Sequence, residues 1–116
     1  MANERVKPVE LIDNDYNRTY VLEFSREVVQ QAEKNGFSLQ DTERYPSKLA
    51  DLFFYAFLMH HSVERITRKR TDELLDSIGG ILGAPKGLFE RLGELYIQAY
   101  ETLNDDAKNA RVTVKL

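Results

Sequence analysis

Cysteine is absent from the 116-residue sequence, and this absence excludes disulfide bonds, thiolate metal sites, iron–sulfur clusters and cysteine-based catalysis. No apolar run approaches the roughly 20 residues that a membrane-spanning helix requires. The first residues lack the apolar stretch of a secretory signal peptide. The net charge of −3 disfavours nucleic acid and anionic membranes as partners. We therefore expect a cytoplasmic protein that does not bind membranes.

The composition is that of an ordinary folded domain. Hydrophobic residues make up 42% and charged residues 30% of the chain, which is too apolar for a chain that is disordered throughout. A length of 116 residues predicts one domain spanning the whole chain. We expect its ends, residues 1–8 and 104–116, to be flexible.

Two short segments with strong β-forming residues predict an N-terminal β-hairpin, with strands at residues 9–13 and 19–24. Residues 14–18 between them are rich in Asn and Asp, which tolerate the left-handed backbone of a turn. The C-terminal residues 111–116 also alternate, and they either form a third strand beside the hairpin or stay loose. In the second strand, alternate apolar residues share the face that we expect to be buried: Tyr20, Leu22 and Phe24.

About four helices are predicted to follow the hairpin, which gives an α+β fold because an isolated hairpin is only marginally stable. The first covers residues 26–35, with Ser25 as its N-cap and Gly36 in the left-handed position after its end. The second begins near Pro46 and includes residues 49–61.

The third helix is predicted to begin after a Thr71 cap and to end at Gly79. The fourth covers residues 86–103, and we expect the segments 38–45 and 81–87 to be connecting loops. A glycine inside the fourth helix, Gly93, costs up to about 1 kcal/mol relative to Ala, and a close crossing with another helix would explain it.

The helix over residues 49–61 is the most informative segment. One face has the i, i+3, i+4 spacing of a helix packed on a core: Leu49, Leu52, Phe53, Ala56 and Phe57. Apolar residues continue around the helix at four further positions: Phe54, Tyr55, Leu58 and Met59. A helix of this kind is either covered on all sides within its own fold or presents one face to a partner.

Catalytic and metal-binding patterns are weak in this sequence. His60 and His61 are adjacent, so on a helix their side chains point about 100° apart and do not share one ion. His60 with Glu64 would supply too few ligands for a structural zinc site. The glycine-rich segment 79–87 lacks the spacing of a phosphate-binding loop. We therefore predict no enzymatic activity and no bound cofactor or metal.

Residues 65–70 are locally basic, and they support an alternative function as a small DNA-linked regulatory or protein-interaction module. No aromatic residues are interleaved with these charges, and the whole chain is acidic. A solvated connection between two helices is therefore the favoured interpretation of this stretch.

Four segments, taken in order, resemble the small tail assembly chaperones of long-tailed phages and prophages. An EF-x-R pattern spans Glu23–Arg26, and a GF pair follows at Gly36. An LF-x-x-AF-x-x-HH pattern spans Leu52–His61, and the last segment lies within residues 88–103. Together they lie within residues 19–103, which is most of the chain.

The resemblance implies a non-enzymatic assembly factor in the cytoplasm of the host cell. Members of that family coat the helical tape measure protein before the tail tube polymerises around it. The implied partner is the tape measure protein, and the major tail tube protein and further copies of this chain are additional candidates. An apolar groove for such a helix would use the exposed sides of the second and fourth helices: Phe54, Tyr55, Leu58, Met59, Tyr96 and Tyr100.

Overall fold

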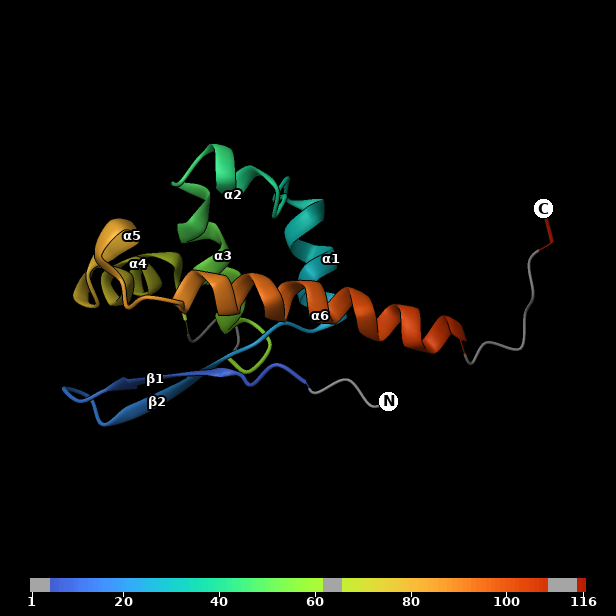
Figure 1. Cartoon of the computed structure of the whole chain (residues 1–116). Helices are drawn as coiled ribbons and strands as arrows, with labels where there is room; N and C mark the ends of the chain where they lie inside the picture. The colour runs from blue at the N-terminus through green and yellow to red at the C-terminus, as the bar shows by residue number, and fades with distance from the viewer. Residues whose placement is uncertain (1–4, 62–65, 109–114) are drawn as a thin grey trace.

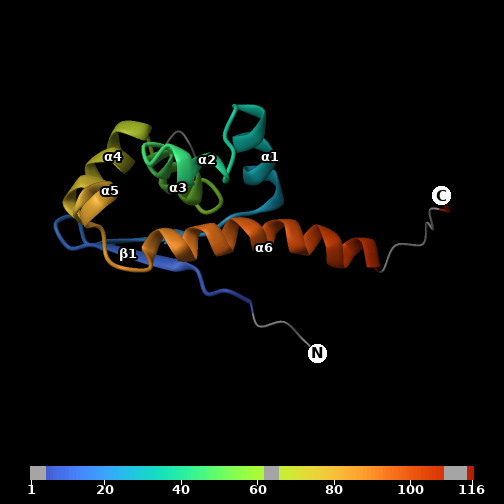
Figure 2. The same cartoon turned by 45° about the horizontal axis from the view of Figure 1, so that its top comes forward.

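The computed structural model describes residues 5–61, 66–108 and 115–116, with the backbone alone for residues 101–108. The elements run in the order β1 (Val9–Asp13), β2 (Arg18–Leu22), α1 (Arg26–Lys34), α2 (Asp41–Arg44), α3 (Lys48–Phe57), α4 (Arg68–Ser77), α5 (Gly80–Gly83) and α6 (Leu88–Lys108). The helices lie on one side of the hairpin, and α6 extends past the other elements at its C-terminal end (Figures 1 and 2). The predicted α+β fold with an N-terminal hairpin is confirmed.

The hairpin follows from alternation and turn chemistry. Strands β1 and β2 pair antiparallel, with Val9 opposite Leu22 and Leu11 opposite Tyr20. Asn17 in the turn has a left-handed φ of 52°, a conformation that Asn tolerates. The predicted inward face of β2 and the residues after it is confirmed, since Tyr20, Leu22 and Phe24 are all buried.

Local signals also set both ends of α1. The Ser25 side chain accepts a hydrogen bond from the backbone N–H of Val28, which is the predicted N-cap. At the other end, Gly36 has a φ of 92° and the N–H of Phe37 donates to the carbonyl of Ala32 at 2.9 Å. This pattern satisfies helix-end carbonyls and turns Phe37 back into the core, where it is buried.

Helix α3 is central to the core. The face with regular helical spacing is the one that is buried. Leu49 at its start is half-buried, and the other four side chains are at most 1% exposed: Leu52, Phe53, Ala56 and Phe57. The ring of Phe57 contacts those of Phe53 and Tyr20 edge-on, with centroids 5.1 and 5.4 Å away. Edge-on contacts of this kind stabilise aromatic cores beyond the burial of area alone.

The predicted start of the third helix is wrong. Helix α4 begins three residues before Thr71 because Thr67 is its N-cap, accepting from the backbone N–H of Arg70 at 3.1 Å. Thr71 is instead completely buried on the core-facing side, and its hydroxyl donates to the carbonyl of Arg68. Both threonines fit the local cap pattern, and the inward orientation of Thr71 decides between them.

Two predicted loops contain single-turn helices. The segment 38–45 contains α2, which is anchored by Leu39 packing against the core, and the segment 81–87 overlaps α5. A side chain at Gly79 would place a Cβ 2.2 Å from the carbonyl oxygen of Gly83, and the φ of Gly79 is +117°. Glycine is therefore required where α4 ends and α5 begins, and the predicted end of that helix is confirmed.

Helix α6 begins at Leu88 and continues past the predicted end at Leu103 to Lys108. The predicted close crossing at Gly93 is wrong, because a Cβ built there meets nothing within 4 Å. The segment predicted as an alternative third strand lies largely outside the described residues.

At the N-terminal end, residues 1–4 also lie outside the described part, whereas the N–H of Val6 donates to Gln98 on α6 at 2.6 Å. Among residues 5–61 and 66–108, the structure contains no helix with the length and apolarity needed to cross a bilayer.

Candidate partner-binding surface

The side chains predicted to bind a partner do not form one groove. Phe54 is half-buried and lies beneath the guanidinium of Arg68, which is 5.8 Å from the ring centroid. The Tyr55 ring lies 5.4 Å from that of Phe54 and 5.9 Å from that of Phe37, and its hydroxyl accepts from Asn35. Phe54 and Tyr55 are therefore in contact with each other, but the first also lies against α4 and the second against the residues that follow α1.

The other predicted residues differ widely in exposure. Leu58 is half-buried, Met59 is 41% exposed and Tyr100 is 36% exposed, with its hydroxyl donating to the Glu33 carboxylate. Tyr96 is 2% exposed and belongs to the core, so its predicted place on an exposed face is wrong. Its ring contacts those of Phe24 and Phe37 because the hairpin and α1 close over this side of α6.

The Tyr96 hydroxyl is buried without a hydrogen-bond partner in the described part of the chain. Burial, and then the nearby Tyr100 and Glu33, raise the pKa of Tyr96 well above its usual range. A phenol with a raised pKa stays neutral, and burial has removed the hydrogen bonds that its hydroxyl would make to water.

An apolar groove that the sequence pattern did not predict lies between α6 and the α2–α3 segment. The groove has a volume of about 570 Å³ and its floor includes the core residue Leu52. Ile97 is 49% exposed at one wall, while the remaining apolar walls come from half-buried side chains: Leu39, Leu49 and Phe89. We call this the α3–α6 groove.

Gly93 also lines the α3–α6 groove, and this location explains why a glycine interrupts α6. The space that a Cβ would occupy is empty to a distance of 4 Å. A larger side chain would project into this hollow instead of colliding with another helix. The glycine therefore leaves this part of the groove unfilled, at the cost of roughly 1 kcal/mol in helix stability.

The rim of the α3–α6 groove is acidic. Glu43 on α2 and Glu90 and Glu94 on α6 border it, and all three are exposed. No ion pair is found for them within the described residues. Glu90 and Glu94 have i, i+4 spacing, at which like charges destabilise a helix unless a cation lies nearby.

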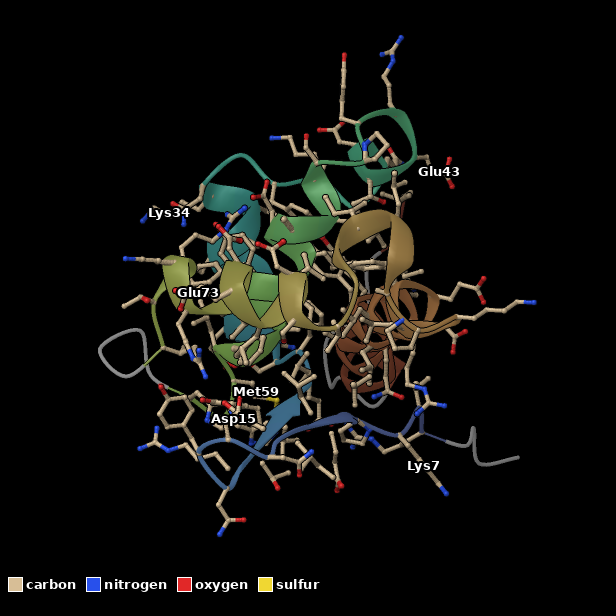
Figure 3. The ribbon with its side chains drawn as sticks, turned by 90° about the vertical axis from the view of Figure 1, so that its left-hand side faces the viewer. Lys7, Asp15, Lys34, Glu43, Met59 and Glu73 are labelled. Atoms are coloured by element: carbon tan, nitrogen blue, oxygen red, sulfur yellow. The ribbon has the colours of Figure 1, made fainter. Side chains whose placement is uncertain are left out.

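The α3–α6 groove and the predicted face on α3 are separate surfaces. In Figure 3, Met59 lies close to the hairpin, whereas Glu43 projects from the opposite side of the helices. A partner seated in the groove would therefore contact α2 and the first half of α6, and not Met59.

The comparisons with known proteins identify one family. A family model described as a domain of unknown function (DUF5055) matches residues 1–116. The chain belongs to the DUF5055 family. No curated protein and no solved structure matches it.

Two arginines of the basic stretch are already paired with carboxylates in this DUF5055 member. Arg68 lies 2.7 Å from Asp51 and 2.9 Å from Asp72, and Arg70 lies 2.6 Å from Asp13 on β1. These contacts join α4 to α3 and to the hairpin. Arg65 lies outside the described residues, and Lys69 is exposed. The paired arginines have a structural role, which weakens the DNA-linked alternative.

The adjacent histidines connect α3 to β2. The N–H of Val21 donates to Nε2 of His61 at 3.2 Å, and Nε2 of His60 lies 2.8 Å from a Glu23 carboxylate oxygen. Burial, and then the neighbouring His60, lower the pKa of His61, which favours the neutral ring that accepts from Val21. Within the described residues, no group of three or more His, Asp or Glu side chains could hold a metal ion.

Proposed function

We propose that this DUF5055 member is a non-enzymatic tail assembly chaperone that shields apolar helical segments of a phage tape measure protein before the tail tube forms. The single observation that carries the proposal is the α3–α6 groove, with its apolar floor and acidic rim. The resemblance of residues 19–103 to tail assembly chaperones supports it independently.

The groove suits one face of an amphipathic helix. Its apolar walls would cover residues at i, i+3, i+4 and i+7 of a client helix, as in other helix-in-groove complexes. Burying each large apolar side chain contributes about 1.5–3 kcal/mol, so a few such contacts offset the cost of association without making the complex permanent. Moderate affinity is what a chaperone needs if the tube protein is to displace it.

The acidic rim of the groove favours client helices that carry positive charge. Glu43, Glu90 and Glu94 would attract a client segment whose apolar stripe is bordered by Lys or Arg. Such an attraction is screened by salt, so binding should weaken as ionic strength rises. A client with an acidic border would be repelled, which gives the groove a means of selecting among helices.

The test is co-purification of the chain with the tape measure protein encoded in the same genome. Replacing Ile97 with Asp puts a charge on an exposed wall of the groove and should weaken capture at least tenfold. The matched control is Leu82→Asp on α5, which changes a residue that is 97% exposed and does not line the groove. Thermal unfolding monitored by circular dichroism checks that both variants are folded.

Three results would count against the proposal: no capture by the unmodified chain, equal capture by both Asp variants, or a genome without a tape measure gene near this one. Met59→Asp tests the partner-binding face predicted within residues 49–61, where Met59 lies just after the end of α3. If Met59→Asp abolishes capture while Ile97→Asp does not, the client binds beside the hairpin and the groove is not its seat.

A further inference from the structure

Strand β2 has its outer edge closed by the helices. The N–H of Val21 donates to His61, and the N–H of Glu23 donates to the carbonyl of Ala56 at 2.9 Å. Both groups point away from β1. Because backbone groups alternate in direction along an antiparallel strand, Leu22 between them exchanges its hydrogen bonds with β1.

Within the described residues, no further strand pairs with the outer edge of strand β1. Glu10 stands opposite Val21, and Ile12 stands opposite Thr19, so both are at positions whose backbone groups point away from β2. No backbone or side-chain partner for these outward N–H groups is found among the described residues. The Ile12 side chain is 63% exposed beside this edge. An open edge of this kind is a template for pairing with another strand.

An apolar groove of about 340 Å³ adjoins the open edge of β1. Val9 and Leu11 form one wall, and Ile78 at the end of α4 and Leu88 at the start of α6 form the other. Val9 and Leu11 lie opposite the buried residues of β2, so their side chains point toward the helices. A third strand beside β1 would direct alternate side chains into this hollow. We call it the β1–α6 groove.

The mouth of the β1–α6 groove is basic. Lys86 and Arg91 line it, are exposed and have no ion-pair partner within the described residues. The first turn of α6 adds the partial positive charge of a helix N-terminus at the same place. The exposed carboxylate of Glu10 borders the groove too, but it belongs to the outward-facing set of β1. The charge around the groove therefore favours an acidic ligand.

We propose that the open edge of β1 binds an extended, acidic segment of a partner protein as a third antiparallel or parallel strand. Backbone bonds to Glu10 and Ile12 would hold it, an aliphatic side chain would fill the β1–α6 groove, and a carboxylate would lie near Lys86 and Arg91. This surface is separate from the α3–α6 groove, so the inference does not depend on the proposed chaperone function.

The test uses a fluorescent, acetylated peptide of seven residues in which Val and Glu alternate, titrated with the full chain and followed by fluorescence anisotropy. Binding should saturate and weaken with added salt. Ile12→Pro removes one outward N–H without removing a bond to β2, and should weaken binding at least fivefold relative to Ile12→Val. Arg91→Glu should weaken it at least tenfold, whereas Lys69→Glu on α4 should leave it unchanged.

A second probe keeps the test decisive if Ile12→Pro does not fold. The same peptide, methylated on its central backbone nitrogens, cannot form the ladder and should not bind the unmodified chain. The inference is overturned if both peptides bind equally, if no binding is seen at 1 mM, or if Ile12→Pro binds as tightly as Ile12→Val. The inference is also overturned if the unmodified chain forms a dimer without peptide and the Ile12→Pro variant is monomeric, because a second copy would then occupy the edge.

Discussion

Substitutions at Gly93 should change the stability of helix α6 and the binding of a client independently. It lies inside α6, has an ordinary helical φ, and would give a Cβ no neighbour within 4 Å. Replacing it with Ala should raise the free energy of unfolding by about 1 kcal/mol, because Ala loses less backbone entropy on folding. For a domain of this size, that gain corresponds to an increase in melting temperature of roughly 4 °C.

A larger side chain at the same position should leave the stability of α6 unchanged or increased, but should weaken client binding. Leu has nearly the helix propensity of Ala, so Gly93→Leu should be at least as stable as the unmodified chain. Its side chain would enter the α3–α6 groove, beside Leu49 and Phe89, and occupy the volume needed by a client helix. We expect capture of the tape measure protein to fall at least tenfold while stability stays the same or rises.

The assays are urea unfolding for stability and isothermal titration with a tape measure fragment for binding. The control is Ser77→Ala on α4, a change that does not touch the groove and should leave binding unaffected. A loss of stability in Gly93→Ala would refute the reasoning, since it would show that the Cβ meets something. Unchanged binding by Gly93→Leu would show that the groove is not the client site.

Three further predictions concern stability. The lowered pKa of His61 means that the unfolded chain binds this proton more tightly, so the free energy of unfolding should fall as the pH drops below the usual value of 6.5. Urea unfolding at about pH 7.5 and about pH 5 should show a smaller pH effect in His61→Gln, whose amide oxygen can still accept from Val21; an equal effect would contradict this assignment. Tyr96→Phe should raise the melting temperature, because it removes a buried hydroxyl that has no hydrogen-bond partner and whose burial costs about 1 kcal/mol. A decrease would mean that the hydroxyl does have a partner. Asp13→Ala should cost roughly 1–3 kcal/mol in urea unfolding, since it leaves the half-buried Arg70 without its 2.6 Å contact to β1, and Asp15→Ala in the exposed turn is the comparison expected to cost less.

Features that depend on near neighbours in the chain were predictable without a structure. Alternation placed Tyr20, Leu22 and Phe24 on one face, and the Ser25 cap and Gly36 set the ends of α1. The core face of α3 was equally predictable, because helical spacing brings its residues to one side. Each of these depends on contacts within a few residues, and such contacts can be recognised without a fold.

The tertiary structure alone decided which apolar residues are covered. Tyr96 and Ile97 are adjacent on α6, yet the first is buried beneath Phe24 and Phe37 and the second stands at the wall of a groove. Periodicity shows that a side chain is apolar and on a given face, but not whether another element reaches that face. The positions of α1, α2 and the hairpin around α6 result from the packing of the whole chain, so the grooves they leave open could not be predicted from local pattern.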